Sequence, residues 1–240
     1  MNISPAGLIA AGILACTGVT QAVVITANTQ SYSTTVTLNS GTTTDNTPPT
    51  NQTFPNSGTI SSTGIASTQS SLGPGSWQFN GLNLASVAAS RSGGAGNDPV
   101  TVAASAVHTI AFTLGVGESA LVTLNMNYSL AEAGGHNATL GWSFTGPGGT
   151  VSGISGNMTT AATNTSIAQQ QVNIATAGTY TFTLTSALPS AAITKSSSAS
   201  AAVNSFDLDI NMVTVPEPAS AMLGSLGVGL LMFRRRRIPS

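Results

Sequence analysis

Apolar side chains occupy every second position along several stretches of this chain, and the positions between them carry hydroxyl or carboxamide groups. In residues 122–130 the apolar positions are Val122, Leu124, Met126, Tyr128 and Leu130, and the polar ones are Thr123, Asn125, Asn127 and Ser129. Successive side chains of a β-strand point to opposite faces of a sheet, so this alternation indicates a strand with one buried and one hydrated face.

The same alternation recurs along the body of the chain, in residues 32–38, 108–114, 140–144, 180–185 and 206–212. Turn signals that contain Gly or Pro separate these stretches, and we find no convincing amphipathic helix among them. Residues 23–214 are therefore predicted to form an all-β domain, an antiparallel β-sandwich of jelly-roll-like kind. The chain has no repeat of fixed period, which disfavours a β-solenoid.

One hairpin is predicted from its turn residues. Asn80-Gly81 is the preferred pair for a two-residue type I′ turn. This turn would place Phe79 opposite Leu82 and Trp77 opposite Leu84, all on one face.

Three stretches lack a clear period of two. Residues 40–76 are rich in Pro, Ser, Thr and Asn, so we expect long loops there, with one short strand near Thr59. Residues 159–171 and 190–202 are polar or small and are expected to be looser as well.

Charge is scarce throughout, at 5% of residues against about 25% in average soluble domains. Four of the six basic residues stand together at residues 234–237, which leaves two upstream, Arg91 and Lys195, against six acidic residues. A body with two cations and a formal charge of −4 cannot neutralise a phosphate backbone. Nucleic-acid binding is therefore excluded.

The residue types of common catalytic and metal centres are also scarce. The single cysteine, Cys16, excludes an intrachain disulfide, and the two histidines, His108 and His136, are too few for a three-histidine zinc site. GxSxG, P-loop and strand-linked GxGxxG motifs do not occur in the sequence. We therefore expect a protein that is not an enzyme and holds no metal or cofactor.

Three polar residues of the body remain as candidates for a site. Asp207 and Asp209 project from the same side of the last strand, and we expect them to be solvated and to protect a strand edge. A Ca²⁺ site at this pair is the alternative, although Ca²⁺ prefers several oxygens from a loop. His108 begins a core-facing series and is expected to be a hydrogen-bonded residue at a strand end.

Aromatic and acidic residues could serve a sugar-binding or sugar-cleaving site. Trp77 and Trp142 are expected in the core rather than as platforms on which a sugar ring stacks. Glu118 with Glu132, or Asp45 with Asp98, would be the acid/base pair of a surface hydrolase, a third class that nothing in their spacing supports.

The N-terminus predicts export. Residues 6–16 form an apolar run of signal-peptide length, too short for a comfortable membrane span. Small residues at Thr20 and Ala22 predict cleavage after Ala22, so that residues 1–22 are a signal peptide and Val23 is the mature start. The usual Lys or Arg near the N-terminus is absent. A lipoprotein signal ending at Cys16, or a buried N-terminal strand or helix, are the alternatives.

The C-terminus predicts a membrane segment. Val215, Pro216, Glu217 and Pro218 precede an uncharged run, residues 219–233, and Arg234, Arg235, Arg236 and Arg237 follow it. Fifteen helical residues span about 22 Å, less than the roughly 30 Å of a bilayer core, a mismatch that snorkelling arginines and local thinning absorb. The arginines place the tail in the cytoplasm and the body outside, by the positive-inside rule. A plain membrane anchor is the alternative to a processed one.

These features, in this order, resemble the PEP-CTERM sorting signal of bacterial surface proteins. The resemblance covers about the last 25 residues, 215–240: the box Pro216-Glu217-Pro218, the transmembrane helix 219–233 and the basic tail 234–237. It implies recognition by an exosortase, a membrane-bound processing enzyme that cuts near the box, in a bacterium that makes extracellular polysaccharide. It implies nothing about the activity of the body.

The sequence as a whole predicts an exported bacterial protein with a structural or adhesive role at the cell surface or in an exopolysaccharide matrix or biofilm. Before processing it would be anchored in the membrane by its C-terminal helix. The alternative is a carbohydrate-binding module of that matrix, which would need exposed aromatic residues on one sheet face or loop rim.

Overall fold

Strands and the turns between them make up nearly all of the chain that the computed structural model describes, which is residues 23–38, 41–47, 50–54, 58–91, 100–133, 138–159, 162–193 and 197–213. Residues Ala22–Val213 form one compact unit. The predicted signal peptide with its cleavage site at Ala22, the sorting motif and the predicted C-terminal helix lie outside the described residues.

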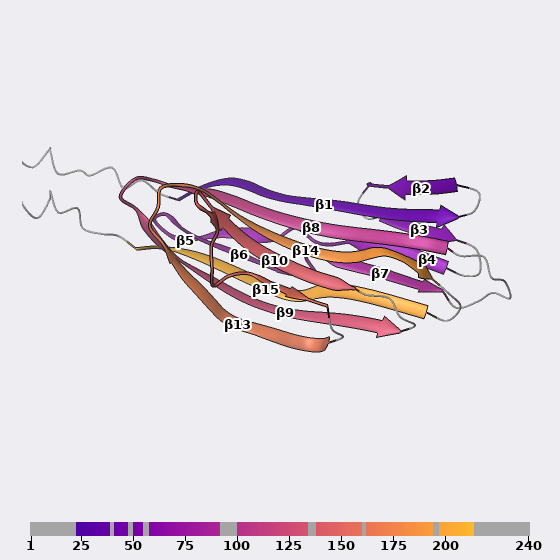
Figure 1. Ribbon diagram of the computed structural model, residues 1–240. Helices are drawn as coiled ribbons and strands as arrows, with labels where there is room; N and C mark the ends of the chain where they lie inside the picture. Colours follow the sequence, from indigo (N-terminus) through magenta and orange to yellow (C-terminus); the bar gives the residue numbers. More distant parts are fainter. Residues whose placement is uncertain are drawn as a thin grey trace, which may run out of the picture. The chain divides into compact units, whose positions relative to one another are not determined.

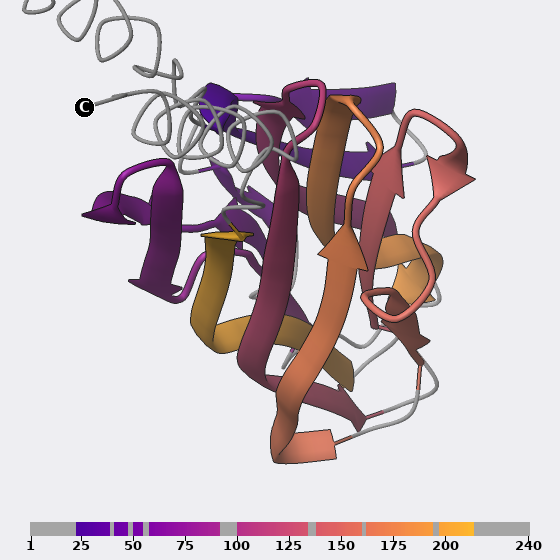
Figure 2. The ribbon, with the colours of Figure 1, turned by 90° about the vertical axis from the view of Figure 1, so that its left-hand side faces the viewer.

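The strands form two antiparallel sheets (Figure 1). The first sheet has the order β11 (Gly149–Thr150), β10 (Thr139–Gly146), β14 (Gly178–Ile193), β8 (Val100–Leu114), β1 (Val24–Leu38) and β2 (Gly41–Asp45), with β12 (Gly156–Met158) paired to β10. The second has the order β13 (Ala162–Ile174), β9 (Ser119–Ala133), β15 (Ser197–Val213), β7 (Ser86–Arg91), β4 (Gly58–Thr63) and β3 (Thr50–Phe54). Two further strands belong to the second sheet: β6 (Ser76–Leu82) pairs with β15, and β5 (Thr68–Gly73) pairs with β6. Figure 2 shows β6, β15, β9 and β13 side by side across this sheet.

The central strands pair in a nested order, in which the two strands of each pair lie, in sequence, between the two strands of the pair before it. β7 pairs with β15, β8 with β14, β9 with β13 and β10 with β12, and each sheet takes alternate pairs. This is the strand order of a jelly roll, here widened by β1–β2 on one sheet and β3–β4 on the other. The prediction of an all-β fold with antiparallel sheets is confirmed.

The core lies between the two sheets. Along β8 every second residue is buried, from Val100 to Leu114, as the alternation predicts for a strand with one hydrated face. Rings from both sheets meet there: Phe182 of β14 lies 5.5 Å from Phe206 of β15, centroid to centroid. Full burial of such a side chain stabilises the fold by about 1.5–3 kcal/mol, so these contacts hold the sheets together.

The expected loops in residues 40–76 are wrong for most of that stretch. The short strand near Thr59 is present as β4, but β2, β3 and β5 are strands as well. Thr has a high β-propensity, and its hydroxyls pair across neighbouring strands: Thr35 with Thr44 at 3.2 Å and Thr37 with Thr42 at 3.1 Å. Strands whose two faces are both hydroxyl-rich have no hydrophobic period to detect.

The two other stretches expected to be looser are also largely strands. Residues 159–171 contribute most of β13, and residues 190–202 contribute the end of β14 and the start of β15. Small residues supply the buried face in β15: Ala199 is 3% exposed and Ala201 is fully buried. Since Ala and Ser differ little in hydrophobicity, the alternation is real but weak in the sequence.

The predicted Asn80-Gly81 hairpin is wrong. β6 runs straight through both residues and pairs with β15, so that Phe79 lies opposite Leu208 and Trp77 opposite Ile210. The chain then continues in the same direction along β15 into β7, past Asn83, whose φ is +54°. The long-range pairing with β15 overrides the local turn signal. Gly81 is needed for another reason, because a Cβ atom there would lie 2.7 Å from Leu84 Cδ1.

Replacing Gly156 with alanine tests the packing of the first sheet. Gly156 lies opposite Trp142, and a Cβ atom at Gly156 would be 2.1 Å from Trp142 Cζ2 inside a buried ring. We expect Gly156→Ala to lower the free energy of unfolding by about 1–3 kcal/mol in urea titrations, because the ring must move. Gly148→Ala is the matched control: its Cβ meets nothing within 4 Å, and a change below about 0.5 kcal/mol is expected. Equal effects of the two substitutions would contradict this packing.

Candidate functional site

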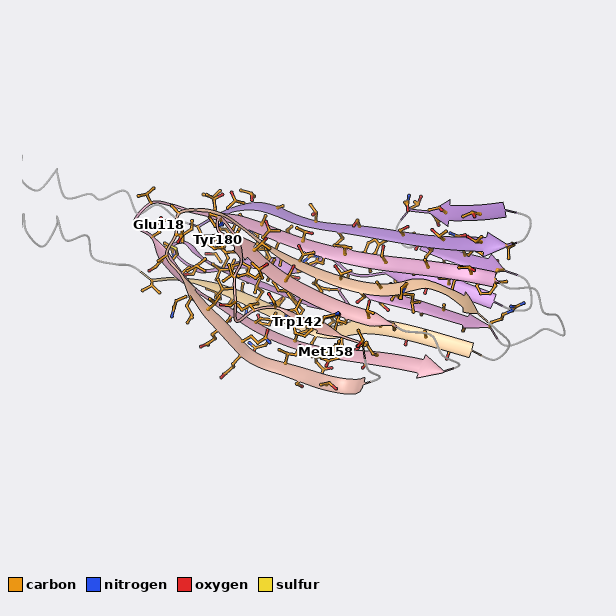
Figure 3. The ribbon with its side chains drawn as sticks, in the orientation of Figure 1. Glu118, Trp142, Met158 and Tyr180 are labelled. Atoms are coloured by element: carbon orange, nitrogen blue, oxygen red, sulfur yellow. The ribbon has the colours of Figure 1, made fainter. Side chains whose placement is uncertain are left out.

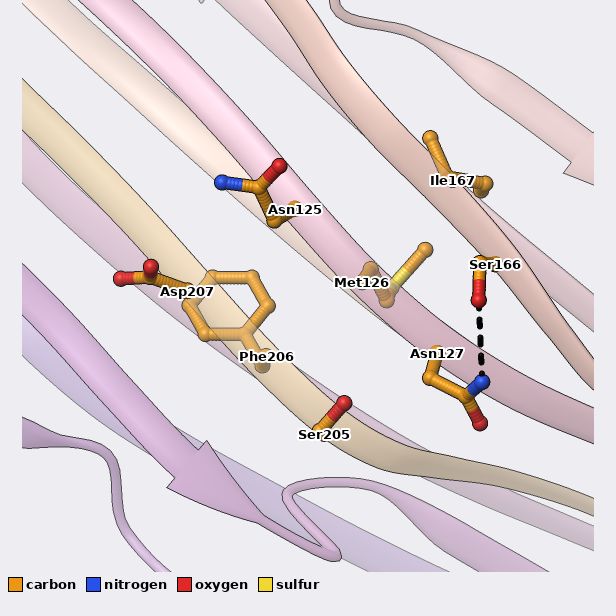
Figure 4. A pocket seen from close by; sticks show the side chains of 8 residues that line it. All are labelled: Asn125, Met126, Asn127, Ser166, Ile167, Ser205, Phe206 and Asp207. Carbon is orange, nitrogen blue, oxygen red and sulfur yellow. Dashed lines mark hydrogen bonds between the residues drawn. The ribbon is translucent and has the colours of Figure 1, made fainter.

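A shallow groove of about 280 Å³ lies on the outer face of the second sheet. We call it the outer groove. It is lined by Asn125, Met126 and Asn127 of β9, Ser166 and Ile167 of β13, and Ser205, Phe206 and Asp207 of β15 (Figure 4). Five of these residues carry hydroxyl, carboxamide or carboxylate groups.

Strand register brings the polar residues of the outer groove together. Asn125 lies opposite Asp207 on β15, and Asn127 lies opposite both Ser205 on β15 and Ser166 on β13. Each position is on the outward side of its strand, next to inward-facing core residues. Residues that alternate within three neighbouring strands thus form one polar surface.

Two irregularities shape the outer groove. Asn204 is an extra residue between Val203 and Ser205 in the pairing of β15 with β9, and its amide donates to Asn127 Oδ1 at 3.0 Å and to Ser129 Oγ at 2.8 Å. On β13 the register shifts between Ile167 and Gln170, and Gln169 has a φ of +51°. Such bulges bend a strand locally and redirect its side chains.

Hydrogen bonds fix the side chains that line the outer groove. Asn127 Nδ2 donates to Ser166 Oγ at 3.2 Å, as Figure 4 shows, and Asn125 Oδ1 accepts the backbone N–H of Gln169 at 2.9 Å. Asp207 Oδ1 accepts from Gln78 Nε2 at 3.0 Å. Amide donors beside hydroxyl and carboxylate acceptors are suited to ligands that carry many hydroxyl groups.

Asp207 and Asp209 are not at a strand edge, which corrects the expected role in edge protection. β15 lies inside the sheet, between β9 and the strands β6 and β7, and both carboxylates are half-buried. Partial burial raises the pKa of Asp209, as does the negative charge of Asp207, while a hydrogen bond from Gln78 opposes the shift. One oxygen of Asp209, Oδ1, is buried with no hydrogen-bond partner.

A metal site at these aspartates gains no further ligand from the structure. Among the described residues there is no group of three or more His, Cys, Asp or Glu side chains that could hold a metal ion.

His108 is a buried core residue, in the middle of β8 rather than at the expected strand end. The strand begins at Val100, earlier than the apolar series that made His108 look terminal. Its Nε2 lies 3.0 Å from Ser67 Oγ, and that hydroxyl donates to Asn28 Oδ1 at 3.0 Å. We assign the Nε2–H tautomer, since the serine proton is already directed at Asn28.

This contact does not make Ser67 a nucleophile. A histidine that donates to the hydroxyl cannot also accept its proton, and Ser67 is only 6% exposed. Burial lowers the pKa of His108 to about 4, and Nδ1 has no hydrogen-bond partner. His108 is therefore neutral at physiological pH.

The prediction of a core position is confirmed for Trp142, whereas Trp77 is half-buried. Trp142 is 3% exposed and donates from Nε1 to Gln170 Oε1 at 3.0 Å; Trp77 packs against the core and donates to the Val23 carbonyl at 3.0 Å. Between residues 23 and 213 all eleven aromatic residues are described, and ten are buried while Trp77 is half-buried.

Of the two pairs considered for sugar hydrolysis, Glu118 and Glu132 are not brought together. Glu118 and Glu132 lie at opposite ends of β9, about 45 Å apart at 3.3 Å per residue. Figure 3 shows Glu118 at one end of the strands, where one of its carboxylate oxygens accepts the Gly115 N–H at 2.6 Å. Asp98 of the other pair, His136, and the sorting residues Val215, Pro216, Glu217, Pro218 and Arg234 to Arg237 lie outside the described residues.

No protein-family model matches the chain, and no curated protein matches it in sequence. Within the described residues, moreover, there is no helix that is long and apolar enough to cross a membrane.

The stability of the protein is expected to depend on pH through His108. The folded state holds its pKa at about 4, against 6.5 ordinarily, so the unfolded chain binds more protons between these values and stability is lost as the pH falls. This residue alone should lower the free energy of unfolding by about 3 kcal/mol between pH 6.5 and pH 4. Urea unfolding measured across this range should show a much shallower pH dependence in His108→Gln. Gly148→Ala, whose added Cβ meets nothing within 4 Å, is the control and should keep the parent slope, whereas equal slopes in all three proteins would refute the assignment.

Proposed function

We propose that this chain is an exported, non-enzymatic structural or adhesive protein of a bacterial cell surface or exopolysaccharide matrix, delivered by a PEP-CTERM-like sorting signal. The observation that carries the proposal is the order of features at the C-terminus. Val215, Pro216, Glu217 and Pro218 come directly after the last strand, followed by the uncharged run 219–233 and the four arginines.

The physical properties of these segments suit delivery to a processing enzyme. The apolar helix holds the chain in the bilayer, and the two prolines keep the box extended, because proline fits neither a helix interior nor a central strand. Glu217 supplies a charge for recognition by an exosortase-type enzyme. The arginines keep the tail on the cytoplasmic side.

The body supplies a surface suited to a hydrated polysaccharide. Of the 240 residues, 65 are Ser or Thr, and only 5% are charged. In the described part many hydroxyl and carboxamide groups lie on the outer faces, for example in the ladder of Thr35, Thr37, Thr42 and Thr44 and in the outer groove. Such faces exchange hydrogen bonds with water and sugar hydroxyls without the strong fields of a charged surface.

Removal of residues 220–240 tests the proposal. We expect the truncated protein to lose its normal place at the cell surface, because the segment that holds it for processing is gone. The measurement is the distribution of the protein among cytosol, membrane, surface and medium. A variant with Arg234, Arg235, Arg236 and Arg237 all replaced by lysine is the control and should keep its topology, since either cation satisfies the positive-inside rule. Unchanged surface location of the truncated protein would contradict the proposal.

A carbohydrate-binding module is the second candidate, and the outer groove is the observation that favours it. Three strands present Asn125, Asn127 and Asp207 there beside the hydroxyls of Ser166 and Ser205. The burial of the aromatic residues removes the usual stacking platform, so a sugar would have to be bound through hydrogen bonds alone. Each such bond gives little net energy, because it replaces one to water.

A glycan array separates the two functions. With purified residues 23–214, the structural role predicts that no defined sugar binds at millimolar concentration, a free energy of about −4 kcal/mol. Binding of one defined sugar at that level would instead favour the module. It should then be lost in the double variant Asn125→Ala and Asp207→Ala, and kept in the control Thr43→Ala on β2, in the other sheet.

A further inference from the structure

Exposed aliphatic side chains gather at one end of the strands. Six large hydrophobic residues are exposed in the described part of the chain, and four of them lie at the end where β1 begins and β15 finishes. These four are Val24 (59% exposed), Leu72 (49%), Val116 (89%) and Val213 (45%). We call them the apolar end.

Strand pairing places the four residues at the same end. Val24 lies opposite Thr113, just before the turn that carries Val116, and Val213 lies opposite Ser119, just after that turn. Leu72 is the next-to-last residue of β5, just before the turn to β6, and Met212 N donates to Ser76 Oγ at 3.0 Å, which fixes that hairpin beside the end of β15. Figure 1 shows β1 starting, and β8 giving way to β9, at this end, and Figure 2 looks at it directly.

Val116 is held outward by a tight turn. Glu118 N donates to the Gly115 carbonyl at 3.3 Å, Gly115 N donates to Glu118 Oε2 at 2.6 Å, and Gly117 has a φ of +80°. The carboxylate of Glu118 is thereby tied to the backbone of its own turn, and the apolar side chain stands at the tip. Val116 and three more exposed aliphatic residues therefore give this end of the strands an apolar character.

We propose that the apolar end rests on the lipid bilayer while the protein is anchored. The inference rests on the proposed function, since the C-terminal segment must be in the membrane. Residues 214–218 are the only link between Val213 and the apolar run that starts at Ala219. Fully extended, this link reaches about 20 Å, so the end of β15 stays within that distance of the lipid.

The partner is the uncharged interfacial region of the bilayer rather than an anionic lipid. The apolar end offers aliphatic side chains, and the body as a whole carries a formal charge of −4, which anionic headgroups would repel. Contact with the bilayer buries valine and leucine side chains, and it sets the long strands upright, so that β2 and the far ends of the sheets point away from the membrane.

The test uses the full chain in vesicles of zwitterionic phosphatidylcholine that contain a lipid with a nitroxide quencher near its carbonyl groups. In a Cys16→Ser background, an environment-sensitive fluorophore is attached at Val116→Cys in one variant and at Thr43→Cys in another. Both positions are exposed. Thr43 pairs with Val36, twelve residues along β1 from Val24, which places it roughly 40 Å from the apolar end.

We expect the label at position 116 to shift its emission to the blue and to lose intensity through quenching, and the label at position 43 to do neither. Equal quenching at the two positions, with the protein still floating with the vesicles, would overturn the inference and leave the proposed function standing. If the label at position 116 loses intensity only because labels on two copies of the chain contact each other, the inference is overturned in favour of self-association. If the chain does not float with the vesicles at all, the proposed membrane anchoring fails, and this inference fails with it.

Discussion

Apolar packing between the inner faces of the two sheets is the main source of the stability of this fold. Charged residues are 5% of the chain and the single cysteine precedes the body, so ion pairs and disulfides contribute little. What remains is apolar burial, worth about 25 cal/mol per Å², together with the antiparallel ladders. Ring contacts are part of this core: Phe182 packs against Phe206, and the rings of Phe112, Phe144 and Tyr180 stack with centroids 5.6–6.1 Å apart.

This division of labour leaves the outer faces free of any role in core packing. They carry mainly hydroxyl and carboxamide groups, with the carboxylates of Asp207 and Asp209 among them, and the outer groove lies where bulges at Asn204 and Gln169 disturb three neighbouring strands. His108 is among the titratable groups buried in the described part; burial keeps it neutral, and its Nε2 lies against Ser67 Oγ. The protein thus combines a largely apolar interior, a hydrated exterior with few charges and an apolar end from which the chain continues into its C-terminal segment.

The sequence allowed the fold to be predicted where large apolar residues alternate with polar ones, as in β8 and β9. It failed where Ala supplies the buried face, as at Ala199 and Ala201, and where Thr lines both faces, as in β2. The Asn80-Gly81 signal was overridden because β15 offered β6 a full ladder. The alternation in the sequence indicates that Asn125, Asn127 and Asp207 point outward. It does not indicate that they lie together, because that depends on the register of β13 and on two bulges, which only the assembled sheet determines.

The most direct measurement of the central claim, that the sheets are delivered to the outside by the chain's two ends, is the intact mass and cellular location of the natural protein. The account predicts a species in the cell envelope or medium that begins at Val23 and is therefore lighter than the 23.9 kDa of the whole chain. A cytosolic protein with the full 23.9 kDa mass would contradict it.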